Sequence, residues 1–259
     1  RYRVGPVQAG VPAHAWKRFA LSRHVVFDDR DTHTVRMGLQ IAQLAGTVPV
    51  AHVQARWSEE QGHTAKRICD EVLGNRPFAV LHPTPKFLYK RWHAAGWREL
   101  AEWLLGKGMQ VVLTGGTEEQ ERAHAREIFA ELPEGVHDLI GRYSLGEIAA
   151  LLSRARVYIG PDTVTTHLAA ALGIPTVALF GPSNPVKWGP WPKDYDAARN
   201  PYIVRGTQRA GNVVLVQGEG ACVPCFLEGC DRHVNSYSQC LQSMSAEKVR
   251  GAVETLIGP

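Results

Sequence analysis

From Phe78 onward, short runs of apolar residues alternate with longer segments whose apolar positions repeat at helical spacing. The apolar runs predict strands at 79–82, 110–115, 136–141, 157–160 and 175–181. The helical spacing predicts helices at 97–107, 118–132, 145–153, 163–172 and 245–256. Strands that are continuously apolar are typical of a parallel sheet covered by helices on both faces. We therefore predict an α/β fold with a doubly wound parallel sheet.

The beginning of the chain carries fewer elements. The pattern there predicts a helix at 16–21, a strand at 24–27, a helix at 34–44 and a connector at 48–60. One strand and its neighbours are too few to bury a core. We interpret residues 1–58 as the C-terminal remnant of another α/β domain with its connector, and residues 59–259 as a second domain. The chain begins with Arg1 in mid-pattern, so we expect an N-terminal portion to precede it.

Composition excludes some classes of protein. The formal net charge is +4 and the pI is about 8.8, but the lysines and arginines are spread along the 259 residues. Nucleic-acid binding would be expected to gather them in clusters. No apolar run reaches the roughly 18 residues that a membrane-spanning helix needs, and the polar start does not resemble a signal peptide. We expect a cytoplasmic protein that does not bind nucleic acid.

Polar residues follow several of the predicted strands, where open parallel sheets bind their ligands. After the strand at 157–160 comes Pro-Asp-Thr-Val-Thr-Thr-His, which opens the next helix. Backbone N–H groups and hydroxyls at the positive end of a helix dipole suit a pyrophosphate. In the alternative interpretation, Asp162 or Thr163 only caps the helix and His167 is a packed histidine.

Two further strand ends carry charged residues. Lys86, Lys90 and Arg91 follow the strand at 79–82, where cations can neutralise phosphate or simply be solvated. Glu118 follows the strand at 110–115, where a carboxylate commonly holds ribose hydroxyls, or else favours the first turn of a helix. The Gly115-Gly116 pair between them departs from the dinucleotide-binding fingerprint Gly-x-Gly-x-x-Gly.

A longer string joins these signals to a known family. Residues 160–185, Gly-Pro-Asp-Thr-Val-Thr-Thr-His-Leu-Ala-Ala-Ala-Leu-Gly-Ile-Pro-Thr-Val-Ala-Leu-Phe-Gly-Pro-Ser-Asn-Pro, resemble the signature of glycosyltransferase family nine, the ADP-heptose:lipopolysaccharide heptosyltransferases. The segments 32–35, 90–92 and 115–119 resemble the same family at matching places. The resemblance covers essentially the whole chain. It implies a GT-B fold, in which two α/β domains face each other across the active site, with residues 1–58 belonging to the acceptor side.

The resemblance also implies roles for individual residues. Lys90 would contact the donor phosphates and Glu118 the ribose, while Ser144 and Leu145, in the loop 141–145, would lie near the base. The pyrophosphate and the transferred sugar would be surrounded by Asp162, Thr163, Val164, Thr165 and His167. Lys90 and the helix N-terminus can stabilise the departing nucleotide without a metal ion, so no cofactor is expected for catalysis. We interpret Asp28-Asp29-Arg30-Asp31, which superficially offers Asp-x-Asp, as an exposed turn.

The catalytic base is not identified. In the family it is an aspartate of the first N-terminal segment, and nothing in this sequence matches that segment. We expect the base in the portion that precedes Arg1, with Lys90 and Asp162 as supporting residues.

Four cysteines crowd near the C-terminus, in a loop at about 217–241. Cys222, Cys225, Cys230 and Cys240 include a Cys-x-x-Cys pair and have the composition of a tetrahedral zinc or iron site, in which His233 could replace one ligand. The spacing resembles a four-cysteine element of the autotransporter heptosyltransferases in this family, which carry iron. Such a metal would be structural and would pin the loop. The alternatives are two disulfides or reduced thiols.

The sequence thus predicts an inverting glycosyltransferase that transfers a sugar, heptose from ADP-heptose, to a lipopolysaccharide-core or similar glycan or protein acceptor. We expect it to associate loosely with the inner membrane, where lipid acceptors reside. Two alternatives stay open: a nucleotide-sugar epimerase, and a nucleotide-sugar-binding module without catalysis. Trp188 and Trp191 either form a wall of the cleft or pack a loop.

Overall fold

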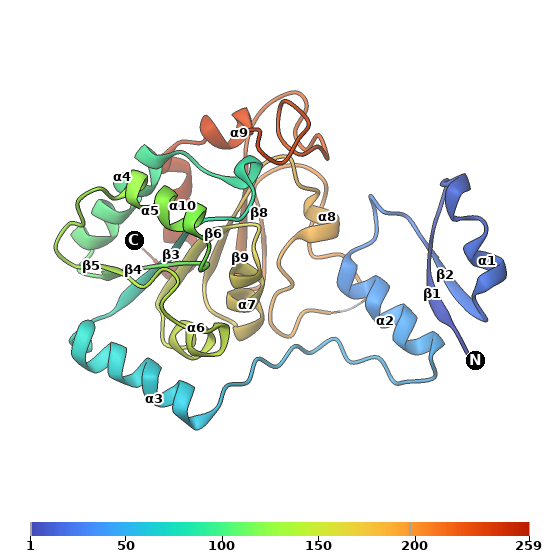
Figure 1. The fold of residues 1–259 in the computed structure, drawn as a ribbon, viewed down its shortest axis with the longest axis horizontal. Helices are drawn as coiled ribbons and strands as arrows, with labels where there is room; N and C mark the ends of the chain where they lie inside the picture. Colours follow the sequence, from blue (N-terminus) through green and yellow to red (C-terminus); the bar gives the residue numbers. More distant parts are fainter. Residues whose placement is uncertain (1, 197, 259) are drawn as a thin grey trace.

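The structure is a computed structural model that describes residues 2–196 and 198–258. Most of the chain forms one α/β domain, and a small N-terminal unit stands beside it (Figure 1). The domain is built on a seven-stranded sheet with the order β5-β4-β3-β6-β7-β9-β8. Its strands are β3 (Phe78–Thr84), β4 (Gln110–Gly115), β5 (Val136–Asp138), β6 (Val157–Pro161), β7 (Thr176–Phe180), β8 (Gln208–Ala210) and β9 (Val213–Gln217). All neighbours pair in parallel except β8, which pairs antiparallel with β9.

Helices cover both faces of this sheet, as the apolar strands require. One face packs against α4 (Ala94–Gly106), α5 (Glu119–Ile128) and α10 (Ala246–Ile257). The other packs against α3 (Glu59–Arg67), α6 (Leu145–Leu152) and α7 (Val164–Leu172). Every residue of β3, β6, β7 and β9 is buried, because a central parallel strand has apolar neighbours on both faces. The predicted doubly wound α/β fold is confirmed.

Some elements differ from the prediction. Strand β9 was not predicted. Its Val-Val-Leu-Val run is typical of a buried strand, but the run follows a stretch rich in proline and glycine. The prediction also missed β8 and the short α8 (Pro185–Trp188). The strand predicted at 136–141 ends at Asp138, where the carboxylate accepts a hydrogen bond from the Ile140 N–H and turns the chain. The helix predicted at 118–132 ends at Ile128.

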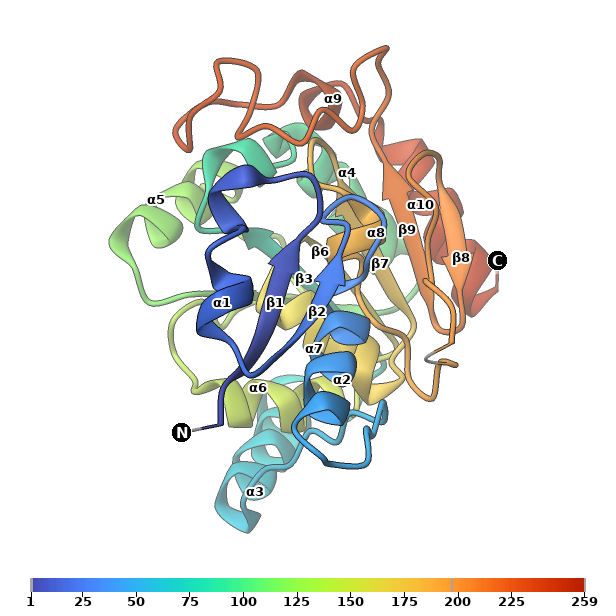
Figure 2. The ribbon, with the colours of Figure 1, turned by 90° about the vertical axis from the view of Figure 1, so that its right-hand side faces the viewer.

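The N-terminal unit is a small layer of α/β structure (Figure 2). Strands β1 (Val4–Gln8) and β2 (Arg23–Phe27) pair in parallel, and between them lie a short 3₁₀ turn (Pro12–His14) and α1 (Lys17–Ala20). Helix α2 (Thr34–Leu44) packs on both strands. The sequence reading missed β1. Phe19 is 93% exposed and Trp16 is 63% exposed, so this unit buries little apolar surface of its own.

A connector without helix or strand leads from α2 to α3, where Ser58 and Gln61 form a capping box. Helix α3 continues into a π-helical turn (Ile68–Val72) that buries Cys69, as expected for an isolated cysteine on a helix. The start of α3 at Glu59 coincides with the boundary we proposed, but the division into two domains stays a prediction. None of the described helices is long and apolar enough to cross a membrane.

Candidate functional site

The predicted strand-end segments meet at one edge of the sheet. Strand β3 lies between β4 and β6, and all three run in the same direction, so their carboxyl ends are neighbours. A cavity of about 450 Å³ opens there. It is lined by His82, Thr84, Pro85, Lys86, Phe87, Lys90, Thr114, Gly115, Gly116, Thr117, Glu121, Tyr143, Leu145, Ile148, Asp162, Thr163, Val164 and Thr165. Four segments that are distant in the sequence therefore line a single cavity.

Lys90 and Asp162 form the polar centre of this edge. Lys90 ends a 3₁₀ turn (Leu88–Lys90), and its Nζ lies 2.7 Å from Asp162 Oδ2 and donates to the Asp162 carbonyl at 3.2 Å. On the other side, His167 Nε2 lies 3.4 Å from Asp162 Oδ1. The side chains of Lys90 and Asp162 are 20% and 10% exposed, so solvent screens this ion pair much less than a surface pair.

These neighbours control the ionisation of Asp162. Burial disfavours the carboxylate, but the hydrogen bond from His167 and the charges of Lys90 and His167 outweigh it, and the pKa of Asp162 is lowered. Asp162 is therefore a carboxylate at neutral pH. It holds the Lys90 ammonium beside the N-terminus of α7.

That N-terminus presents unused donors. Helix α7 begins at Val164, and within the described residues the Thr163 side chain makes no capping hydrogen bond. The first backbone N–H groups of a helix lack intrahelical partners, and together with the dipole they attract anions. Thr166 is turned inward instead, where its hydroxyl contacts Tyr158 at 2.9 Å. The Thr163 hydroxyl contacts the Thr166 hydroxyl at 3.2 Å, so the donors that remain for a ligand are the backbone N–H groups at the start of α7.

A neutral histidine lies deeper in the same cavity. Burial lowers the pKa of His82 to about 4, and its Nδ1 lies 3.0 Å from the Thr114 hydroxyl. That hydroxyl donates to the Leu81 carbonyl, so His82 Nδ1–H donates to Thr114 and leaves Nε2 as an acceptor. Thr84 Oγ1 is buried and has no partner among the described residues. The floor of the cavity thus carries polar atoms that a ligand can satisfy.

The acidic residue that lines the cavity differs from the one we predicted. Glu118 is the N-cap residue of α5, is exposed and is not part of the lining. Glu121, one turn further, is buried and accepts a 2.6 Å hydrogen bond from the Gly116 N–H. A side chain at Gly116 would collide with it, since an added Cβ would lie 2.5 Å from Glu121 Oε2. Glu121 could have been predicted from its spacing, because residues three positions apart, such as Glu118 and Glu121, lie on the same side of a helix.

The loop 141–145 borders the same cavity through Tyr143 and Leu145. Ser144 is the N-cap of α6 and forms a capping box with Glu147, whose carboxylate accepts from the Ser144 N–H at 2.8 Å. The structure therefore gives Ser144 a local role, while contact with a ligand base stays a prediction.

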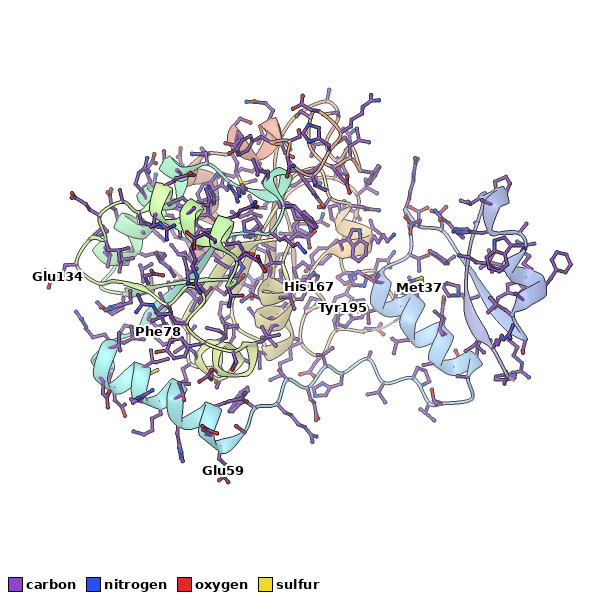
Figure 3. All side chains as sticks on the ribbon, viewed as in Figure 1. Met37, Glu59, Phe78, Glu134, His167 and Tyr195 are labelled. Carbon is purple, nitrogen blue, oxygen red and sulfur yellow. The ribbon has the colours of Figure 1, made fainter. Side chains whose placement is uncertain are left out.

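A second, larger cavity of about 710 Å³ adjoins the first. The two share Lys90, Asp162, Thr163 and Val164 as a common wall. Beyond this wall the second cavity reaches the N-terminal unit, α8 and the cysteine-rich loop; Figure 3 shows His167 of its lining on the side of the domain that faces α2. Those three parts contribute Asp29, Arg30, Lys187, Trp188, Phe226, Leu227 and Glu228.

Two sequence interpretations gain detail here. The Asp28–Asp31 segment is an exposed turn, as interpreted, except that Asp29 is half-buried, forms an ion pair with Lys187 and lines the second cavity. The two tryptophans separate: Trp188 is 43% exposed at the cavity, whereas Trp191 is buried against His33, with ring centroids 4.8 Å apart. Trp188 therefore lines a cavity wall, and Trp191 packs within its loop, so each of the two alternatives applies to one tryptophan.

The predicted metal site is unsupported. Cys225 and Cys240 are partly buried, while Cys222 and Cys230 are exposed. Burial and the three nearby thiols raise the pKa of Cys240 to about 11. Across residues 2–196 and 198–258, no three or more His, Cys, Asp or Glu side chains are arranged to hold a metal ion. All four thiols are free in this structure.

The chain is similar to known proteins over much of its length. Residues 6–213 match the profile of glycosyltransferase family 9 (heptosyltransferase). Lipopolysaccharide heptosyltransferase 3 of Escherichia coli is 28% identical over 155 residues, which are 59% of this chain and 44% of that protein. Lipopolysaccharide heptosyltransferase 1 of Pseudomonas aeruginosa is 37% identical over 126 residues, which are 49% of this chain and 34% of that protein. The matches span less than half the length of these curated relatives.

Solved structures show the same fold. A family 9 glycosyl transferase from Veillonella parvula superposes with a TM-score of 0.70 at 19% identity, covering 94% of this chain and 65% of that one. ADP-heptose lipopolysaccharide heptosyltransferase II of E. coli gives a TM-score of 0.67 at 21% identity, covering 99% and 77%. The fold is that of GT-B heptosyltransferases. Since the family profile matches well over half of its residues, the chain belongs to glycosyltransferase family 9, the heptosyltransferase family.

Proposed function

We propose that this chain is the donor-binding part of an inverting glycosyltransferase, which transfers heptose from ADP-heptose to a lipopolysaccharide-core or similar acceptor. The observation that carries the proposal is the wall shared by the two cavities. The nucleotide would occupy the 450 Å³ cavity and the heptose would enter the 710 Å³ cavity, with the acceptor arriving from the side of the N-terminal unit. The sugar–phosphate bond would then lie at Lys90 and Asp162.

The chemistry of this wall suits the departure of a diphosphate. When the bond between the heptose anomeric carbon and ADP breaks, negative charge develops on the leaving phosphate oxygen. In the proposed arrangement the Lys90 ammonium, which pairs with Asp162, and the N–H groups of α7 would face that oxygen and stabilise its charge. The acceptor hydroxyl attacks the anomeric carbon from the face opposite the leaving diphosphate, and this attack inverts the configuration. The hydroxyl gives its proton to a base.

The rest of the donor would extend along the first cavity. The loop 141–145 would lie against the base, and a carboxylate from the start of α5 would hold the ribose hydroxyls. Glu118 was our predicted ribose ligand, but Glu121 is the carboxylate in the lining. Replacing each glutamate by alanine distinguishes the two candidates. The substitution that removes the ribose ligand should weaken the binding of ADP more than the binding of its 2′,3′-dideoxy analogue, which lacks the ribose hydroxyls.

The proposal is tested by calorimetric titration of ADP, UDP, GDP and dTDP into the chain and into its Lys90→Ala variant. We expect selective binding of ADP that weakens by about 10- to 100-fold in the variant, since hydrogen bonds to charged groups are worth roughly 1.5–3 kcal/mol. Lys66→Ala is the matched control, because Lys66 is an exposed α3 lysine that pairs with Asp70. Selectivity for another nucleotide would overturn ADP-heptose as donor; no binding, or equal binding by the Lys90 variant, would overturn the site.

The two alternative functions predict different products. A nucleotide-sugar epimerase would release free sugar, or convert the nucleotide sugar, without an acceptor. A binding module without catalysis would bind ADP-heptose and yield no product with any acceptor. The proposed transferase yields ADP and a glycosylated acceptor together, and it would work in the cytoplasm, at the inner membrane surface where lipid-linked acceptors reside.

A further inference from the structure

The turn that carries Lys90 is held in place from the far end of the chain. This 3₁₀ turn contains three residues, and its backbone hydrogen bonds are those from Lys90 to Phe87 and from Arg91 to Leu88. The carbonyl groups of the residues on either side of Lys90 accept hydrogen bonds from side chains. Ser238 Oγ donates to the Tyr89 carbonyl at 2.7 Å, and Gln242 Nε2 donates to the Arg91 carbonyl at 2.8 Å.

Both donors belong to one short segment of the chain. Ser238 immediately precedes the short helix α9 (Gln239–Gln242), and its own carbonyl accepts the N–H groups of Leu241 and Gln242. The Ser238 side chain is buried, with the residue 1% exposed. Figure 1 shows α9 beside the cysteine-rich loop, at the edge of the sheet that carries the cavities.

The segment after α9 is fastened to the same stretch of chain. Met244 is buried, and its carbonyl accepts hydrogen bonds from Trp92 Nε1 and His93 Nε2, both at 2.8 Å. Four side-chain hydrogen bonds therefore join residues 238–244 to residues 89–93. Because buried polar groups cost free energy when unpaired, these bonds resist a relative shift of the two segments.

We propose that Ser238 and Gln242 are positioning residues for Lys90: they fix the backbone on both sides of it, so that its ammonium group stays at Asp162 and the N-terminus of α7. This inference rests on the proposed function, in which Lys90 meets the donor diphosphate there. A lysine side chain is long and flexible, so its placement depends on where its backbone is held. Small displacements of a group that binds a developing charge weaken its effect disproportionately.

The chain offers a matched control for this contact. Ser243 lies at the end of the same short helix, is exposed, and donates its hydroxyl to the Gln239 carbonyl at 2.9 Å, away from the Lys90 turn. Ser243→Ala therefore removes a hydroxyl from the same segment without touching the Tyr89 carbonyl. Gln242→Leu provides a second test variant that removes the other contact.

The experiment measures ADP affinity by calorimetry for the chain, for Ser238→Ala, for Gln242→Leu and for Ser243→Ala, each also combined with Lys90→Ala. We expect Ser238→Ala and Gln242→Leu to weaken ADP binding by about 5- to 10-fold, the size of one net hydrogen bond, and Ser243→Ala to leave it unchanged. In the Lys90→Ala background the same substitutions should change affinity less than about twofold, because the group they position is gone. Denaturant unfolding of each variant confirms that it is folded.

Two outcomes overturn the inference. In one, Ser238→Ala and Gln242→Leu bind ADP as the unsubstituted chain does. In the other, they weaken binding equally with and without Lys90, which would mean a general structural role. Failure of the proposed function looks different: the unsubstituted chain would not bind ADP, or Lys90→Ala alone would have no effect, and the inference would fall with it.

Discussion

At the scale of single residues, Asp162 determines what the candidate site can do. It is the buried carboxylate that Lys90 and His167 share, and through it a lysine, a histidine and a helix N-terminus are brought together. An unpaired charge at this depth would be costly, so each partner depends on the others. A substitution of Asp162 should therefore change the free energy of unfolding even without a ligand.

We predict that Asp162→Asn lowers the free energy of unfolding by about 1.5–3 kcal/mol at pH 7, because it removes the charged partner of Lys90. The pKa of Asp162 is lowered in the folded protein, so its contribution is complete above the unfolded-state pKa of about 3.9 and is lost as the pH falls below that value. Urea unfolding at pH 7 and at acid pH should show the difference in stability between the unsubstituted chain and the Asp162→Asn variant shrinking on acidification. A constant difference would contradict the ionic role.

At the scale of elements, two helices of the domain begin with the same kind of cap. Helices α3 and α6 both start with a serine capping box, formed by Ser58 with Gln61 and by Ser144 with Glu147. The first box contributes no residue to the lining of either cavity, whereas α6 contributes Leu145 to the lining of the smaller one. The two boxes therefore make a natural pair in which a structural effect and a ligand contact can be separated.

We predict that Ser58→Ala and Ser144→Ala each lower the free energy of unfolding by about 1 kcal/mol, the usual cost of removing a serine cap. Urea denaturation measures this loss, and ADP titration measures binding in the same variants. If Ser144 only caps α6, both variants bind ADP alike. If ADP binding weakens in Ser144→Ala alone, Ser144 contacts the donor as the family resemblance implies.

At the scale of the whole molecule, the N-terminal unit is attached through the start of α2. His33 Nε2 contacts the Gly189 carbonyl at 2.8 Å while its Nδ1 accepts from the Val35 N–H, and the Thr34 hydroxyl donates to the Lys187 carbonyl at 2.7 Å. Lys187, whose carbonyl accepts from Thr34, also lines the larger cavity. Figure 3 shows Tyr195, on the domain, and Met37, on α2, at the two sides of this junction.

The junction should loosen in acid. Burial lowers the pKa of His33 to about 4, so the folded protein binds fewer protons here than the unfolded chain, whose histidine has a pKa of about 6.5. Its stabilising contribution is therefore complete above pH 6.5 and is lost as the pH falls toward 4. We predict that the radius of gyration from small-angle scattering increases between pH 7.5 and pH 4.5.

His33→Ala should reproduce the expanded state already at pH 7.5, because it removes the same contact. His63→Ala is the control, since His63 is exposed on α3 and away from the junction. Equal radii for the unsubstituted chain at both pH values, or an unchanged radius for His33→Ala, would show that other contacts hold the unit.

The sequence by itself determined the parallel sheet and the edge at which the cavities lie. Apolar runs encode burial on both faces of a strand, and a helix that opens with Pro-Asp-Thr encodes an anion-binding end, so both features are local. Lys90 and Asp162 could be named for the same reason, because each lies in the segment that leads from its strand to the next helix. The missed strand β9 carried an equally local signal in its apolar run, which its proline-rich surroundings concealed.

The tertiary structure alone decided which side chains meet across long separations. It placed Glu121 rather than Glu118 in the lining, paired Asp29 with Lys187, and left the cysteines as free thiols without metal-site geometry. It also brought Ser238 to the Tyr89 carbonyl, 149 residues away. The physical reason is that hydrophobic periodicity specifies which face of an element is buried, whereas the partner of a polar group depends on how whole elements pack.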